Sequence, residues 1–136
     1  MRRVFLFTLL LCLPIIASAC GTGEVTPQGY ENVTITHAHN HWKQGESSPI
    51  PFLFLDVRTP KEYAAGHVPR AKLLPIQSLA DHLKEVPHDR QVYVYCHSGT
   101  RSTKASILLA KHGFTNIENV VGGIVAWKRS GFEVVK

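Results

Sequence analysis

One cysteine of this sequence, Cys96, stands where a strand is expected to end and a bare loop to begin. The apolar run VYVY, residues 92–95, precedes it, and the small, polar and basic residues HSGTR, residues 97–101, follow. Backbone N–H groups in a loop between a strand and a helix can converge on one point and bind an anion. They favour thiolate over thiol, because each stabilises negative charge at sulfur. This stretch therefore predicts a reactive cysteine.

The residues around the thiol strengthen that prediction. Gly99 permits backbone dihedral angles that other residues resist. His97 and Arg101 place basic groups on either side of Cys96. A helix expected at residues 102–112 points the positive end of its dipole at the loop. A buried structural cysteine is the alternative interpretation, but it gives no reason for the bare loop that follows.

The first residues predict export. A basic start, an apolar run at residues 4–16 and the small-residue site Ala17-Ser18-Ala19 occur in the order typical of a secretory signal peptide. The apolar run is too short to span a bilayer, which needs about 20 residues. We expect residues 1–19 to be removed and the mature protein to lie in the periplasm or cell envelope.

Cys20 directly follows the expected cleavage site. The stretch IASAC resembles a bacterial lipobox, in which the cysteine after the cleavage point receives a lipid and becomes the mature N-terminus. Leucine is usual three positions before that cysteine, where this chain has Ala17, and cleavage after Ala19 without lipidation is the alternative. Residues 20–30 then predict a tether, anchored to the membrane through Cys20, ahead of one domain at residues 31–136.

The other cysteines and the net charge limit the functions that this chain can be expected to have. Cys12 leaves with the signal peptide, and a lipid would occupy the sulfur of Cys20, so Cys96 is left as a free thiol in an oxidising compartment. Loss of Arg2 and Arg3 lowers the formal net charge from +5 to +3. That modest charge, without a basic run interleaved with aromatic residues, gives no reason to expect a nucleic-acid partner.

Apolar or β-rich runs alternate with helix-like segments along the domain. Strands are expected at residues 32–36, 52–55, 71–76, 92–95 and 117–121. Helices are expected at 37–43 behind a capping Thr36, after the capping signature Thr59-Pro60-Lys61-Glu62, from Ser78, at 102–112 and at 124–129. The alternation predicts a doubly wound α/β fold, with a mostly parallel five-stranded sheet and helices on both faces. Ligands bind outside the carboxyl ends of such strands, where Cys96 lies.

Three stretches resemble the single-domain rhodanese family of sulfurtransferases, and the likeness spans about residues 31–135. They are LDVRTPKEYAAGHVPRA, with Asp56, Arg58, Glu62, Tyr63, Gly66, His67, Pro69 and Ala71 in place; VYVYCHSGTRS; and GFTNIENVVGGIVAW, with Gly113, Phe114, Gly122, Gly123 and Trp127. The chain departs from the family at Arg70, where glycine is usual, and at Leu73, where asparagine is usual. Both departures lie outside the cysteine loop and concern local turn geometry.

The resemblance implies a persulfide mechanism without a cofactor. Cys96 would take the outer sulfur of a small donor such as thiosulfate and pass it to cyanide or a thiol, in a ping-pong reaction. The loop residues that would hold the persulfide or the donor are His97, Ser98, Gly99, Thr100, Arg101 and Ser102. Arg101, and with it His97, would orient the donor's oxyanion. Arg58 would brace the sheet end together with Asp56, with direct substrate contact as its alternative role.

Two other functions remain open at this stage. Tyrosine-phosphatase relatives of this fold place five residues between cysteine and arginine, whereas four separate Cys96 from Arg101, so the cradle is smaller than phosphate needs. No acidic residue near Cys96 in the sequence is an obvious general acid. A persulfide carrier or binding module for a protein partner would have the same loop, and saturable turnover of small substrates would distinguish it from an enzyme.

The cluster HAHNHW, residues 37–42, has the residue types of a metal site. His37 and His41 would share one face of a helix, but no Cys, Asp or Glu lies within the cluster to complete a ligand set. We interpret it as a solvated polar helix face and predict no metal. His67 belongs to the family signature and is expected to hydrogen-bond to the backbone.

Overall fold

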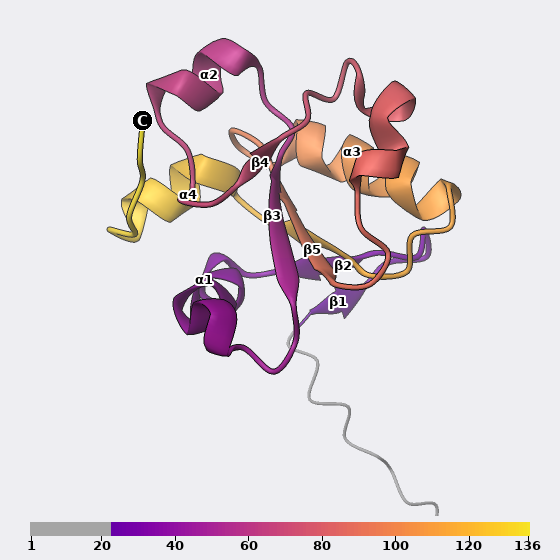
Figure 1. The fold of residues 1–136 in the computed structure, drawn as a ribbon, viewed down its shortest axis with the longest axis horizontal. Helices are drawn as coiled ribbons and strands as arrows, with labels where there is room; N and C mark the ends of the chain where they lie inside the picture. The colour runs from indigo at the N-terminus through magenta and orange to yellow at the C-terminus, as the bar shows by residue number, and fades with distance from the viewer. Residues whose placement is uncertain (1–22) are drawn as a thin grey trace, which may run out of the picture.

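The computed structural model describes residues 23–136, so the predicted signal peptide and Cys20 lie outside the described residues. Helices and strands follow one another in the order β1 (Glu24–Val25), β2 (Glu31–Val33), α1 (Ile35–Gln44), η1 (Gly45–Ser47), β3 (Phe52–Asp56), α2 (Pro60–Ala65), β4 (Lys72–Leu73), η2 (Leu79–Glu85), β5 (Gln91–Tyr95), α3 (Thr100–Lys111), β6 (Ile117–Val120) and α4 (Gly123–Arg129) (Figure 1). Within residues 23–136, no helix is long and apolar enough to cross a membrane.

A single sheet organises these elements, with the strand order β1-β2-β6-β5-β3-β4. Every pairing from β2 to β4 is parallel, and β1 alone pairs antiparallel, with β2. The predicted α/β class and mostly parallel sheet are confirmed, but the sheet has six strands rather than five. The added strand β1 lies in the segment predicted to be only a tether, where it forms a two-residue edge.

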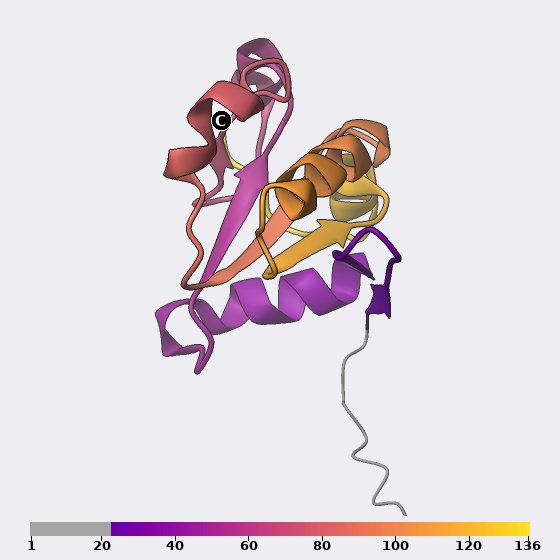
Figure 2. The same ribbon diagram turned by 90° about the vertical axis from the view of Figure 1, so that its right-hand side faces the viewer.

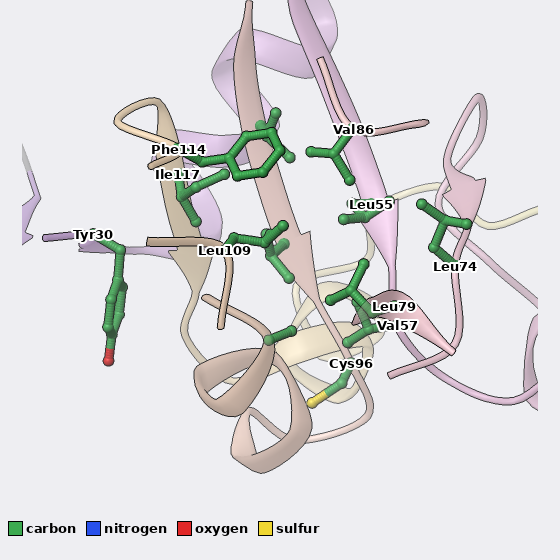
Figure 3. Packing of buried hydrophobic residues seen from close by; sticks show 13 residues of the cluster. Tyr30, Leu55, Val57, Leu74, Leu79, Val86, Cys96, Leu109, Phe114 and Ile117 are labelled. Atoms are coloured by element: carbon green, nitrogen blue, oxygen red, sulfur yellow. The ribbon is translucent and has the colours of Figure 1, made fainter. Parts of the chain in front are cut away.

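Helices cover both faces of the sheet, and two separate cores result. The first, here the aliphatic core, lies beneath α3 and η2 and consists of Tyr30, Leu55, Val57, Leu74, Leu79, Val86, Val92, Val94, Cys96, Ala105, Leu109, Phe114 and Ile117 (Figure 3). The second, here the aromatic core, lies beneath α1 and α4 and consists of Val33, Ala38, Phe54, Val68, Ala71, Tyr93, Tyr95, Val120, Ile124 and Trp127. Figure 2 shows α1 and α3 on opposite sides of the strands.

The central strand β5 supplies both cores because side chains alternate along a strand. Its residues Val92, Val94 and then Cys96 face the aliphatic core, whereas Tyr93 and Tyr95 face the aromatic core. All five are at most 2% exposed. A strand covered on both faces reads as a continuous apolar run, and the sequence has such a run at residues 92–95, where a strand was expected.

Of the two helix caps expected from the sequence, the structure confirms one and moves the other. Thr59 and Glu62 form the predicted reciprocal capping box at the start of α2. The cap of α1 is Thr34 and not Thr36, since the Thr34 side chain accepts a hydrogen bond from the N–H of His37. The segment after Ser78 folds as a 3-10 helix with non-helical backbone at His82, rather than as a regular amphipathic helix.

Arg70, one of the two departures from the family pattern, keeps a turn that suits glycine. Its φ is +67°, in the left-handed region that most residues avoid. The side chain donates to the carbonyl oxygen of Trp42 at 2.8 Å and lies over the Trp42 ring, 5.1 Å from its centre. These two contacts offset the backbone strain, so the turn survives the change of residue.

Candidate active site

Cys96 directly follows the last residue of the central strand β5 and is 1% exposed. Its side chain belongs to the aliphatic core and lies at the edge of that cluster (Figure 3). The residues that follow it form a bend, and α3 begins at Thr100. The predicted arrangement of strand, loop and helix around the thiol is therefore present.

Hydrogen-bond donors of the loop surround the sulfur. The N–H of Gly99 donates to Sγ of Cys96 at 3.1 Å, and the thiol in turn donates to the hydroxyl oxygen of Ser102, 3.5 Å from Sγ. Burial raises the pKa of the Cys96 thiol, but the hydrogen bonds from Ser102 and from the backbone of Gly99 and Arg101 outweigh it. The net pKa is lowered from its ordinary value, so the loop stabilises thiolate as expected.

The loop can turn its N–H groups to the sulfur because its carbonyl groups are held elsewhere. The N–H of Ile124 donates to the carbonyl oxygen of Cys96 at 2.9 Å, and the N–H of Val125 donates to that of His97 at 3.1 Å. Both donors are free N–H groups of the first turn of α4. The sequence places Gly122 and Gly123 in the family motif but gives no signal of this contact.

Gly123 allows that contact by its lack of a side chain. A Cβ atom there would overlap the carbonyl oxygen of Cys96 and lie 2.6 Å from that of His97. The φ of Gly123 is +56°, which also favours glycine. The close approach of two backbone segments therefore requires glycine at this position.

Arg101 is fixed beside the loop by an acidic residue that the sequence had assigned only to a helix cap. Nη1 and Nη2 of Arg101 donate to the two carboxylate oxygens of Glu62, at 2.8 and 2.6 Å. Thr59 donates to Glu62 as well, through its N–H and its hydroxyl. The guanidinium has five N–H groups, so the ion pair leaves others available to an oxyanion.

Glu62 stays ionised in this arrangement. Its hydrogen bond from Arg101, followed by those from Thr59, outweighs partial burial and lowers the pKa of the carboxyl far below its usual range. The parallel strands bring the start of α2 next to the start of α3, although Glu62 and Arg101 are 39 residues apart. Only the fold makes this pair, because nothing in the sequence links the two residues.

The other loop residues contribute mainly backbone. The side chains of His97, Ser98 and Thr100 are exposed, and the hydrogen bonds that lower the pKa of Cys96 come from Ser102, Gly99 and Arg101. The electrostatic role of His97 toward the thiol stays a prediction. Ser102 is fully buried, and its hydroxyl donates to the carbonyl oxygen of Gly99 at 3.1 Å.

Arg58 is placed for the bracing role, and direct contact with a substrate stays an untested alternative. Its guanidinium donates to both carboxylate oxygens of Asp56 and to the carbonyl oxygen of Gly66, and only 3% of the side chain is exposed. Asp56 also accepts a hydrogen bond from the hydroxyl of Tyr95 at 2.7 Å. These buried groups pair with one another at the end of β3, which fits the bracing role.

The histidines of α1 are not the solvated face that the sequence predicted. His39 stacks on Phe132 with ring centres 3.5 Å apart, His41 Nδ1 lies 2.5 Å from the hydroxyl of Tyr93, and His37 pairs with Glu118 at 3.2 Å. All three are half-buried against the aromatic core. Within residues 23–136, no group of three or more potential ligands is placed to hold a metal. His67 hydrogen-bonds to the backbone of Tyr63, as expected.

Fold and site together define a class of protein: an α/β domain whose central parallel strand ends in a cysteine cradled by backbone N–H groups. A family model described as the rhodanese-like domain matches residues 37–130. That match covers more than half of the chain, and the chain belongs to the rhodanese-like family.

Relatives and solved structures agree with this assignment. A sulfurtransferase of Allochromatium vinosum is 42% identical over 83 residues, which are 61% of this chain and 78% of that protein. A rhodanese-related protein of Thermoplasma volcanium has a TM-score of 0.68 at 30% identity, over 76% of this chain and 96% of that one. A rhodanese-like domain protein of Staphylococcus aureus has a TM-score of 0.65 at 34% identity, over 77% and 98%.

Proposed function

We propose that this chain is a sulfurtransferase that moves a sulfane sulfur from a donor such as thiosulfate to cyanide or a thiol through a persulfide on Cys96. The family and the relative named a sulfurtransferase support sulfur transfer in general. The observation that carries the specific proposal is the lowered pKa of the Cys96 thiol beneath the N–H groups of its loop.

In the first step, the Cys96 thiolate attacks the outer sulfur of thiosulfate. A new S–S bond forms at Sγ, the S–S bond of the donor breaks, and its electron pair leaves with sulfite. The backbone N–H groups that stabilised the thiolate then stabilise the negative charge of the persulfide. Arg101 holds the oxyanion of the donor through the N–H groups that Glu62 does not use.

In the second step, a nucleophilic acceptor attacks the outer sulfur of the persulfide. The bond between the two sulfurs breaks, and its electron pair returns to Cys96 as thiolate. Cyanide leaves as thiocyanate and a thiol leaves as a persulfide. Because the enzyme holds the sulfur between the two steps, we expect ping-pong kinetics.

A phosphatase fits these residues less well. The loop has four residues between Cys96 and Arg101, and the acid that the fold brings to it, Glu62, is held ionised by Arg101. An ionised carboxylate cannot donate the proton that a leaving alkoxide requires. Sulfite, the leaving group from thiosulfate, requires no such proton.

Intact mass spectrometry tests the proposal. We expect thiosulfate to add one sulfur atom to the mature protein, cyanide to remove it as thiocyanate, and the Cys96→Ser variant to show neither change. Repeated turnover would distinguish an enzyme from a persulfide carrier, which loads once and waits for its protein partner. No mass gain with thiosulfate would overturn the proposed donor and direct the assay to aryl phosphate hydrolysis.

We also propose export with lipid attachment at Cys20, which rests on the sequence of residues 1–20. Expression of the full chain in a bacterium that processes lipoproteins tests it. We expect the mature protein to carry the mass of a lipid and to sediment with membranes, and the Cys20→Ser variant to lose both properties. A soluble, unmodified chain that begins at Cys20 would show cleavage without lipidation.

A further inference from the structure

A pocket of about 380 Å³ lies where the chain turns from α1 into β3, at the end of the sheet away from Cys96 (Figure 1). Its walls include Trp42, Phe52, Phe54, Pro69 and Arg70. Phe52 pairs with Gln91 of β5, five residues before Cys96. About 17 Å of strand therefore separates the pocket from the thiol, and the proposed sulfur transfer does not account for it.

The walls of this pocket are largely aromatic. Phe54 is 2% exposed, and it meets Phe52 edge to face with ring centres 5.9 Å apart. The indole N–H of Trp42 donates to the carbonyl oxygen of Pro69 at 3.0 Å, which fixes the Trp42 ring against the turn. Binding sites for small molecules are mostly apolar and aromatic pockets of about 300–1,000 Å³, with a few polar groups that orient the ligand. Because a cavity of about 150 Å³ holds a benzene ring, this pocket has room for two fused rings.

Arg70 supplies the charged group of the pocket. Its φ of +67° is one that glycine adopts without strain and that other residues adopt at a cost in free energy. Residues held in such a conformation cluster at functional sites, ligand clamps among them. The guanidinium donates to the carbonyl oxygen of Trp42 at 2.8 Å and lies over the Trp42 ring, and a Cβ atom on Gly45 would lie 3.1 Å from its Nη1. The cation is therefore held in a fixed place.

The charge of Arg70 is not neutralised by the protein. Within residues 23–136, the ion pairs between side chains join other residues. Glu46 also lines the pocket, but it is exposed and forms no ion pair with Arg70 in this part of the chain. The hydrogen bond to Trp42 uses one of the five N–H groups of the guanidinium and leaves others for a carboxylate. The pocket thus combines aromatic walls with a fixed cation.

We propose that this pocket binds planar aromatic carboxylates, with the carboxylate on the Arg70 guanidinium and the rings against the aromatic walls. A neutral aromatic molecule would leave the charge of Arg70 without a partner, and a small inorganic anion would leave the aromatic walls in contact with water. An aromatic carboxylate satisfies both parts of the pocket at once. Because the pocket is remote from Cys96, this inference holds independently of the proposed sulfur transfer.

NMR of the ¹⁵N-labelled mature protein tests the assignment. The probes are indole-3-carboxylate, indole, which has the rings without the charge, and acetate, which has the charge without the rings. The indole N–H of Trp42 and the guanidinium Nε–H of Arg70 report on the pocket, and the amide of Gly99 reports on the Cys96 loop.

Three variants separate the charges. Arg70→Gly removes the cation and suits the φ of the turn, so we expect it to fold, and the dispersion of its amide signals checks this. Lys111→Gln, at the end of α3, loses the same charge far from the pocket. Glu46→Gln removes the carboxylate of the pocket itself.

We expect indole-3-carboxylate to shift both pocket signals in a saturable titration and to leave the Gly99 amide unchanged. Measured at Trp42, Arg70→Gly should weaken this binding about tenfold, to the level of indole, whereas Lys111→Gln and Glu46→Gln should not weaken it. Acetate should bind more weakly than indole-3-carboxylate.

Four results would overturn the proposal. Full binding in Arg70→Gly, or a loss of binding in Glu46→Gln, would remove the role assigned to Arg70. Equally tight binding of acetate would reduce the site to an exposed cation. Pocket signals that stay unchanged up to about 10 mM indole-3-carboxylate, whether or not Gly99 shifts, would show that the pocket does not bind this class of ligand.

Discussion

The two faces of the central strand β5 hold their polar groups in different ways. On the aliphatic side, Cys96 is surrounded by donors that belong largely to the backbone, and its own carbonyl is held by the backbone of α4. On the aromatic side, the hydroxyls of Tyr93 and Tyr95 are held by side chains, those of His41 and Asp56.

This contrast separates what the site requires from what the fold requires. A cradle of backbone N–H groups depends on chain conformation, and it is sensitive to residues that restrict conformation or prevent close approach. A hydrogen bond between two side chains depends on the presence of both partners. Loss of one partner lowers stability where the other is left buried without a hydrogen bond. We therefore expect glycine substitutions to damage the Cys96 side most and hydroxyl deletions to damage the tyrosine side.

The largest effect should come from Gly123→Ala. The new methyl group would overlap the Cys96 carbonyl oxygen in a backbone conformation that already disfavours alanine. We expect the free energy of unfolding in urea to fall by at least about 2 kcal/mol, and persulfide formation to be lost. Gly131→Ala is the control, because φ there is +74° but nothing lies within 4 Å of the added atom. Equal losses in the two variants would remove the role assigned to the close approach.

The tyrosine side is tested by removing one hydroxyl at a time. Tyr95→Phe leaves the buried N–H of Val68 without its partner and removes one of the hydrogen bonds that Asp56 Oδ2 accepts, the others coming from Arg58. We expect a loss of about 1–3 kcal/mol in urea unfolding. Tyr93→Phe removes the hydroxyl shared by His41, His37 and the mostly buried Glu118, and should cost a similar amount, about 1–3 kcal/mol. Both variants should still take up sulfur from thiosulfate, and a loss of uptake would show that the two faces are not separate.

The ion pair between Glu62 and Arg101 should make stability depend on acid. The pKa of Glu62 is lower in the folded than in the unfolded protein, where it is near 4.5. The unfolded chain thus binds more protons in acid, so the contribution of the pair is complete above pH 4.5 and is lost as the pH falls toward the folded pKa.

Glu62→Gln isolates that contribution, since glutamine can keep the helix cap but not the charge. We expect the variant to be less stable than the wild-type protein by about 1 kcal/mol at pH 7, with allowance for partial exposure, and the difference to shrink as the pH falls below 4.5. Urea unfolding of both proteins between pH 7 and pH 3 measures it. A difference that is constant over this range would show that the charge of Glu62 plays no part.

The smallest effect concerns the single side-chain hydroxyl in the cradle. Ser102→Ala removes the hydroxyl that lies 3.5 Å from the sulfur. The side-chain hydrogen bond between Cys96 and Ser102 is among the contacts that lower the pKa of the thiol, so its loss should raise that pKa. We expect alkylation by iodoacetamide at pH 7 to slow severalfold and its pH profile to move to higher pH. Ser106→Ala, one turn further along α3, is the control, since the Ser106 hydroxyl is buried without a hydrogen-bond partner in the part of the chain described. Matching profiles for the two variants would contradict the role of Ser102.

The sequence predicted those parts of the fold that short local patterns specify. The continuous apolar runs gave β3 and β5, the capping box at Thr59 gave the start of α2, and the bare loop after Cys96 gave the position of the thiol. Each of these depends on a few neighbouring residues and on the periodicity of one element.

The missed features all depend on contacts between distant segments. Strand β1 has only two residues, and its pairing with β2 gives it regular structure. The histidines of α1 are polar in sequence, yet aromatic stacking buries His39 against Phe132, beyond the end of α4. The partners of the site, Glu62 for Arg101 and Gly123 for the Cys96 carbonyl, come together only when the sheet places their helices side by side.

The hydrogen bonds from α4 to the carbonyls of Cys96 and His97 also determine the stage of folding at which the loop can be completed. The N–H groups that complete the loop belong to residues 124 and 125, which are synthesised after Cys96 and after every strand of the sheet. Until α4 forms and docks, the carbonyls of Cys96 and His97 lack these partners, so the loop that lowers the pKa of the thiol is completed only by the segment that follows the sheet.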